Sequence, residues 1–205
     1  MPSRKPSSPP SLAEHRANDG TALLIIDMIS GWDFPDAPKL LRQSIAIAPR
    51  IAALKARCRR AGVPVIYAND NRGQWRSDFR RVVANAVQAG GQGGRIVSQI
   101  APDDDDYFVL KPKHSAFFAT PMELLLQHLQ ARRLILTGVA SDQCVVVTAE
   151  DARMRDYEVI VPQDCVASQT PARNRRALAH FEDVMNIRTP ASSRLRLPDP
   201  PTSRR

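Results

Sequence analysis

The chain has 205 residues, which is enough for one domain with a sizeable buried core. Hydrophobic residues make up 43% and aromatic residues 5%, as in an ordinary aliphatic globular protein, and no apolar run reaches the roughly 18 residues of a membrane span. The formal net charge is +8, so nucleic-acid binding has to be judged from where the charges lie.

Most of the excess positive charge lies near the C-terminus. Residues 1–20 carry three basic and two acidic side chains, residues 21–170 carry 18 and 16, and residues 171–205 carry eight and three. The stretch "RTPASSRLRLPDPPTSRR" is also rich in proline and poor in large apolar residues. We therefore predict a solvated, flexible tail and no nucleic-acid surface.

The N-terminus and the cysteines indicate a cytoplasmic protein. Residues 1–19 contain no apolar core of a secretory signal, and their acidic residues argue against a transit peptide. Cys58, Cys144 and Cys165 are an odd number without close spacing, which argues against a disulfide framework and a zinc site. We predict reduced thiols.

Short apolar runs alternate with amphipathic segments along the chain. The run "TALLIID" at 21–27 is nearly continuous, as expected of a strand covered on both faces. The segment 37–62 has apolar positions at helical spacing, and Pro49 predicts a break or kink within it. Further strands are predicted at 63–70, 106–112, 134–140 and 157–164, and further helices at 76–91, 120–133, 141–156 and 170–186.

This alternation predicts a single α/β domain with a mainly parallel sheet and helices on both of its faces. We place the domain at residues 20–188, between a flexible segment at 1–19 and a flexible, basic, proline-rich tail at 189–205. The segment from Pro38 to Ala61 has aliphatic residues on more than one face, so we also expect a homo-oligomer.

Three reactive side chains fall at the carboxyl ends of predicted strands, where such sheets bind ligands. Asp27 closes the first strand, Lys111 closes the third, and Cys144 follows the fourth. If Ser141 caps the next helix, Cys144 lies in its first turn. The free amide N–H groups there would favour a thiolate and could bind an oxyanion.

Each of these residues also has a plainer interpretation. Cys144 could be a small buried hydrophobe, Asp27 could cap a turn, and Lys111 could form a surface ion pair. Lys113 competes for the role of Lys111 but falls in the following loop. Because a buried carboxylate without a partner is costly, we favour Asp27 as a general base, with Lys111 beside it.

The ordered segments "LLIIDM", "VIYANDN", "VLKPKHSAF" and "LILTGVASDQCVVVTAEDA" together resemble the isochorismatase-like cysteine hydrolases. That superfamily includes nicotinamidases, N-carbamoylsarcosine amidases and ureidoacrylate amidases, and the resemblance covers residues 20–187. It implies a Rossmann-like three-layer α/β/α fold, often oligomeric, with a catalytic triad formed by Asp27, Lys111 and Cys144.

The resemblance also implies details of the backbone at the site. Val139 and Ala140 would be joined by a cis peptide, and the N–H groups of Ala140 and Cys144 would form the oxyanion hole. Residues that follow the first three strands are further candidates to line the substrate pocket, although packing roles remain open for them: Trp32, Asn69, Trp75 and His114.

This chain departs from the family pattern at two places, and both bear on which substrate and which metal it could bind. Ile29 stands where many members have glutamine, and "NDNRGQW" lacks the histidine of the metal-binding nicotinamidases. The acidic run at 103–106 is expected to be a solvated loop. We predict no metal and no cofactor.

The predicted activity is hydrolysis of an amide or carbamoyl C–N bond in a small molecule, through an acyl group on Cys144. Nucleic acid and membrane are not predicted partners. Three alternatives remain: vinyl ether hydrolysis, as in the true isochorismatases; a non-catalytic binding protein on the same fold; and a redox sensor that pairs Cys144 with Cys165.

Overall fold

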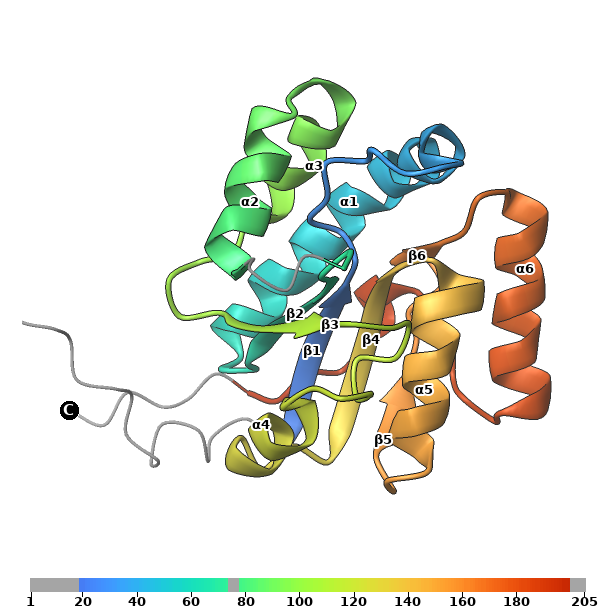
Figure 1. Cartoon of the computed structure of the whole chain (residues 1–205). Helices are drawn as coiled ribbons and strands as arrows, with labels where there is room; N and C mark the ends of the chain where they lie inside the picture. The colour runs from blue at the N-terminus through green and yellow to red at the C-terminus, as the bar shows by residue number, and fades with distance from the viewer. Residues whose placement is uncertain (1–18, 74–77, 200–205) are drawn as a thin grey trace, which may run out of the picture.

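The computed structural model describes residues 19–73 and 78–199, and it confirms the predicted α/β fold with a parallel sheet. Five strands lie in the order β3-β2-β1-β4-β5, and a sixth pairs with β4 (Figure 1). The strands are β1 (Thr21–Ile26), β2 (Val65–Asp70), β3 (Tyr107–Lys111), β4 (Arg133–Val139), β5 (Glu158–Ile160) and β6 (Val166–Ala167).

Helices cover both faces of this sheet, which makes three layers. One face carries α1 (Ala37–Arg60), α2 (Phe79–Gln88) and α3 (Gly91–Ile100). The other carries α4 (Met122–His128), α5 (Val146–Arg153) and α6 (Pro171–Ala179). Over the two described ranges, no helix is long and apolar enough to cross a membrane.

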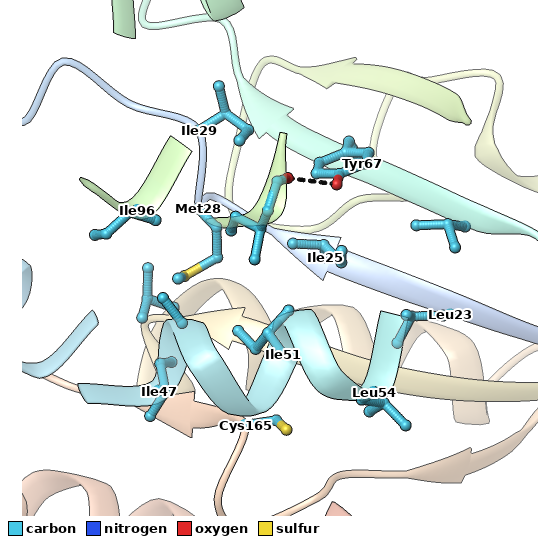
Figure 2. Close-up of a cluster of buried hydrophobic side chains, with 14 of the residues drawn as sticks. Leu23, Ile25, Met28, Ile29, Ile47, Ile51, Leu54, Tyr67, Ile96 and Cys165 are labelled. Carbon is cyan, nitrogen blue, oxygen red and sulfur yellow. Dashed lines mark hydrogen bonds between the residues drawn. The ribbon is translucent and has the colours of Figure 1, made fainter. Parts of the chain in front are cut away.

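The alternation of side chains along β1 divides the core in two. Leu23 and Ile25 pack under α1, in the cluster that Figure 2 shows, whereas Leu24 and Ile26 pack under α4 and α5. All six residues of β1 are buried, because a central strand of a parallel sheet is covered on both faces. Burying each large aliphatic side chain stabilises the fold by roughly 1.5–3 kcal/mol.

Three local features differ from the sequence predictions. Of the break or kink predicted at Pro49, the break is absent, because helix α1 runs through this residue. A whole helix, α3, was missed, because its sequence "GQGGRIVSQI" opens with glycines. Gly93 has a packing reason, since a Cβ there would lie 2.6 Å from Cδ1 of Trp32. Strand β6 was also missed, because two residues are too short to show a period.

The flexible tail predicted from residue 189 is wrong for the described residues 189–199. Thr189 and Leu195 are buried, and the backbone N–H and Oγ of Ser192 donate to Asp164 at 2.7 and 2.8 Å. Arg57 of α1 donates to the carbonyls of Ser192 and Leu195, at 2.7 Å each. The low apolar content of this segment suggested a flexible tail, but backbone carbonyls make many of its contacts with the domain, and these do not depend on apolar side chains.

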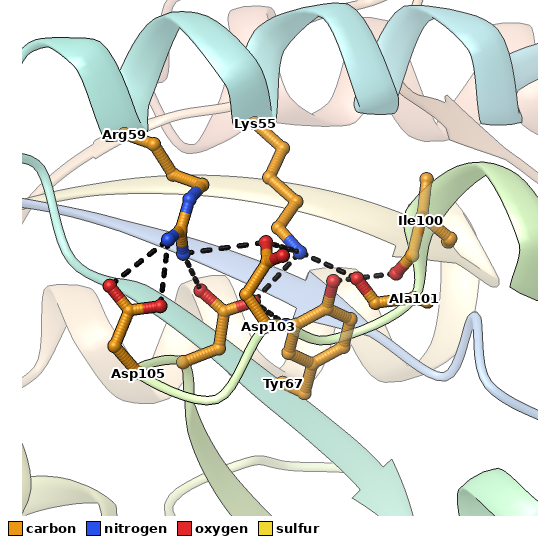
Figure 3. Close-up of polar contacts among 8 residues, drawn as sticks. Lys55, Arg59, Tyr67, Ile100, Ala101, Asp103 and Asp105 are labelled. Carbon is orange, nitrogen blue, oxygen red and sulfur yellow. Dashed lines mark hydrogen bonds and ion pairs between the residues drawn. The ribbon is translucent and has the colours of Figure 1, made fainter.

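The acidic run at 103–106 lies in an exposed turn, as predicted, but it also belongs to an ion-pair network in which the side chain of Asp106 is buried. Lys55 of α1 lies 2.7 Å from Asp106 and 2.9 Å from Asp103, and it donates to the carbonyl of Ala101 at 2.7 Å (Figure 3). Arg59 lies 2.8 Å from Asp106. This network fastens the loop before β3 to α1, and so holds the strand that ends in Lys111.

We predict that Lys55→Met lowers the free energy of unfolding by about 3 kcal/mol, the low end for a broken buried pair, because Arg59 still neutralises Asp106. This free energy can be measured by urea denaturation, with circular dichroism to monitor unfolding. The matched control is Lys39→Met, which removes an exposed ion pair with Asp36 and is expected to have a much smaller effect. Equal effects of the two substitutions would contradict a stabilising role for the network.

Candidate active site

Asp27, Lys111 and Cys144 meet at the carboxyl end of the sheet. Nζ of Lys111 lies 2.8 Å from Oδ2 of Asp27 and 3.5 Å from Sγ of Cys144. Asp27 follows β1, Lys111 is the last residue of β3, and Cys144 lies in a short π-helix, η2 (Ser141–Val145), between β4 and α5. Three separate elements therefore bring the predicted residues together, as expected for ligand sites in parallel sheets.

Lys111 is fully buried, so its charge must be neutralised by neighbours. Burial disfavours the ammonium, but the carboxylate of Asp27 outweighs this effect and raises the pKa of Lys111. A carboxylate oxygen of Asp70 lies 3.8 Å from Nζ of Lys111, and Nζ donates to the carbonyl of Lys113 at 3.3 Å. Lys111 thus remains a cation beneath the thiol.

Asp27 is held by both carboxylate oxygens. Oδ1 accepts the backbone N–H of Asp70 at 2.8 Å, and Oδ2 faces Lys111. The residue has a φ of 53°, which is uncommon for an aspartate and turns its side chain across the end of β2. Neighbouring strands therefore fix the carboxylate before any ligand arrives.

The state of Cys144 differs from the prediction. Burial, followed by the charge of Asp27, raises the pKa of the Cys144 thiol to about 12, so the resting group is a protonated thiol and not a thiolate. Ser141 does not cap the helix: in the described structure its buried Oγ has no hydrogen-bond partner. A base must therefore take the proton when the sulfur reacts.

The backbone before Cys144 is tightly constrained. The Val139–Ala140 peptide is cis, and Gly138 has a φ of +105°. A Cβ on Gly138 would lie 2.0 Å from the carbonyl oxygen of Ile26, so only glycine allows β4 to pass this close to β1. The N–H groups of Gln143 and Val145 both donate to the carbonyl of Ala140, at 3.0 and 3.2 Å.

A cavity of about 690 Å³ opens over these groups. Asp27, Cys144, Val139 and Ala140 line it, together with three of the predicted pocket residues, which are Trp32, Asn69 and His114. The fourth, Trp75, lies outside the described residues. Nδ1 of His114 is 3.6 Å from Sγ of Cys144. In the described structure no group of three or more histidine, cysteine or acidic side chains could hold a metal ion.

The predictions missed several residues that line the cavity. Asp70 and Arg72 come from the end of β2, and the guanidinium of Arg72 contacts Asp33 and Ser30. Their position after a buried strand was the available signal. Gln169 also lines the cavity, from the loop after β6, and had no such signal because that strand is so short.

The matching family model, a related sequence and a solved structure all carry the name isochorismatase. The family model "Isochorismatase domain" matches residues 21–191. The isochorismatase family protein YaaI of Bacillus subtilis is 41% identical over 80% of this chain and 90% of its own. N-carbamoylsarcosine amidase of an Arthrobacter species is 28% identical over 73% of this chain and 60% of its own. A solved isochorismatase family protein from Desulfovibrio vulgaris has a TM-score of 0.69 at 26% identity, over 85% of this chain and 95% of that one.

The raised pKa of Cys144 predicts how the thiol reacts with iodoacetamide. In the native chain the rate should still be rising above pH 9, because a thiol of pKa about 12 is mostly protonated there, whereas a free cysteine titrates near about 8.5. Asp27→Asn removes a negative charge and should speed labelling at pH 8, whereas Lys111→Met removes a positive charge and should slow it. Peptide mass spectrometry measures each site, with buried Cys58 as an internal control.

A labelling profile that levels off near pH 8.5 in all three proteins would contradict this electrostatic arrangement.

Proposed function

The chain belongs to the isochorismatase family of hydrolases, and we propose that it cleaves an amide or carbamoyl C–N bond of a small molecule through an acyl group carried on Cys144. The observation that supports this most directly is the position of the thiol. Sγ lies 3.5 Å from a buried ammonium, which itself lies 2.8 Å from a carboxylate, at the floor of a cavity. The similarity to an N-carbamoylsarcosine amidase supports C–N chemistry.

In the proposed acylation step, Sγ of Cys144 attacks the carbonyl carbon while the carboxylate of Asp27 takes the thiol proton. Lys111 stabilises the negative charge as it moves from the carboxylate to the sulfur. Coupling proton removal to attack suits a thiol whose resting pKa is about 12, because a free thiolate is never required.

The next proposed step is collapse of the tetrahedral intermediate. Its oxyanion would accept from the backbone N–H groups of Ala140, which lies between β4 and η2, and of Cys144, which lies in η2. Asp27 returns its proton to the leaving nitrogen, the C–N bond breaks, and an amine or ammonia departs. The acyl group then remains on Cys144 as a thioester.

Vinyl ether hydrolysis is the competing activity within the family. It would use Asp27 as an acid and would leave the thiol without a chemical role. The contact between the ammonium and Sγ favours acyl transfer, because Cys144 lines the cavity, where a carbonyl carbon can be attacked, with the buried ammonium beneath its sulfur.

The test is a screen of small primary amides and ureido compounds for ammonia release. Cys144→Ala should abolish turnover of any substrate found, and Asp27→Asn should lower kcat by about 10²–10⁴-fold, the usual contribution of a general base. Cys58→Ala is the matched control and should retain activity, because that residue belongs to the buried face of α1 and does not line the cavity. Turnover that survives in Cys144→Ala would rule out the covalent mechanism.

A further inference from the structure

The loop between β3 and α4 is attached to the helical segment that carries Cys144. The Oγ of Ser115 donates to the carboxylate of Asp151, and the backbone N–H of Ala116 donates to Oγ1 of Thr148 at 3.1 Å. Thr148 and Asp151 follow Cys144 by four and seven residues, so all three share one face of the helical segment. Ser115 and Thr148 are buried, which makes these attachments part of the core.

These two contacts determine where His114 lies. The residue immediately before Ser115 is carried to the nucleophile, and its Nδ1 lies 3.6 Å from Sγ. His114 is exposed and lines the cavity. In the same loop, the carbonyl of Lys113 accepts from Nζ of Lys111. The loop backbone is therefore held by hydrogen bonds both before and after His114. The imidazole thus has a fixed position beside the sulfur and access to water.

We propose that His114 is the general base that activates water to hydrolyse the thioester on Cys144, a role that rests on the acyl-enzyme mechanism proposed above. This assignment separates the two halves of the reaction. Asp27 serves acylation, and His114 serves deacylation.

The different exposure of the two groups supports this division. Asp27 is held between the N–H of Asp70 and the ammonium of Lys111 with only 18% of its side chain exposed, whereas His114 is exposed and meets water directly. Lys111 is a donor only and cannot accept a proton from water while it is charged. In the described structure the ring of His114 has one polar partner, the thiol. The proposed role requires the tautomer that carries its proton on Nε2, in which Nδ1 accepts.

Once Cys144 is acylated, the thiol proton is gone and Nδ1 has no donor from the sulfur. A water molecule placed between Nδ1 and the acyl carbon then gives one proton to Nδ1 as its oxygen forms the new C–O bond. The tetrahedral intermediate collapses, the C–S bond breaks, and the sulfur takes the proton back from His114. A carboxylic acid leaves, and the neutral thiol and neutral imidazole are restored.

The experiment uses p-nitrophenyl acetate, an activated ester that acylates thiols, followed by stopped flow. The native chain should release a burst of p-nitrophenolate from acylation, followed by slower turnover from deacylation. His114→Asn should keep the burst rate within about threefold and slow turnover by about 100-fold or more, because only a general base is lost. Intact mass spectrometry should then find the acetyl group accumulating on Cys144.

Two further measurements separate a general base from a structural role. Hydroxylamine, a nucleophile that needs no base, should restore turnover in His114→Asn by accepting the acetyl group. His180→Asn is the matched control, because His180 lies in η3 (His180–Val184), outside the cavity lining, and should behave as the native chain does.

The outcomes are distinct. A native chain that gives no burst beyond that of Cys144→Ala would overturn the acyl-enzyme mechanism, and the role of His114 with it. A normal burst with unchanged turnover in His114→Asn would overturn only the role of His114. Burst and turnover that fall together, without rescue by hydroxylamine, would also overturn that role and leave His114 a residue that positions the thiol.

Discussion

The site depends on one buried charge. Lys111 is fully buried, and an isolated ammonium in that position would be too costly to keep. It stays charged because Asp27 reaches it from β1, two strands away in the sheet, across the end of β2. Three features bring Asp27 and Lys111 together: the order of the strands, the backbone turn at Asp27, and the hydrogen bond from the N–H of Asp70. The thiol of Cys144 then completes the surroundings of the ammonium.

The same arrangement sets the chemistry available to the thiol. A neighbouring lysine lowers the pKa of a thiol, but burial and the carboxylate of Asp27 have the opposite effect and raise the pKa of Cys144 to about 12. A protonated resting thiol is protected from casual oxidation, because the thiolate is the reactive form. The mechanism that we propose therefore requires proton acceptors close to the sulfur, and it assigns this role to Asp27 and His114, which lie on different elements.

Much of the fold was predictable because strong hydrophobic periods mark its long elements. The runs that became β1, β2 and β4 are nearly continuous apolar segments, and each ends beside a residue of the site. Short or glycine-rich elements, such as β6 and α3, carry too weak a period to be recognised. The packed residues 189–199 were missed because their contacts use backbone carbonyls, which all sequences share.

The sequence by itself determined the alternating fold, the family resemblance and the presence of Asp27, Lys111 and Cys144 at strand ends. These features depend on apolar periodicity and on the order of residues along the chain, and both can be read directly from the sequence. Only the tertiary structure decided the protonation state of the thiol and the position of His114. Both depend on distances between elements far apart in the chain. Burial and opposing charges alter a pKa only when the groups are brought within a few ångströms of each other.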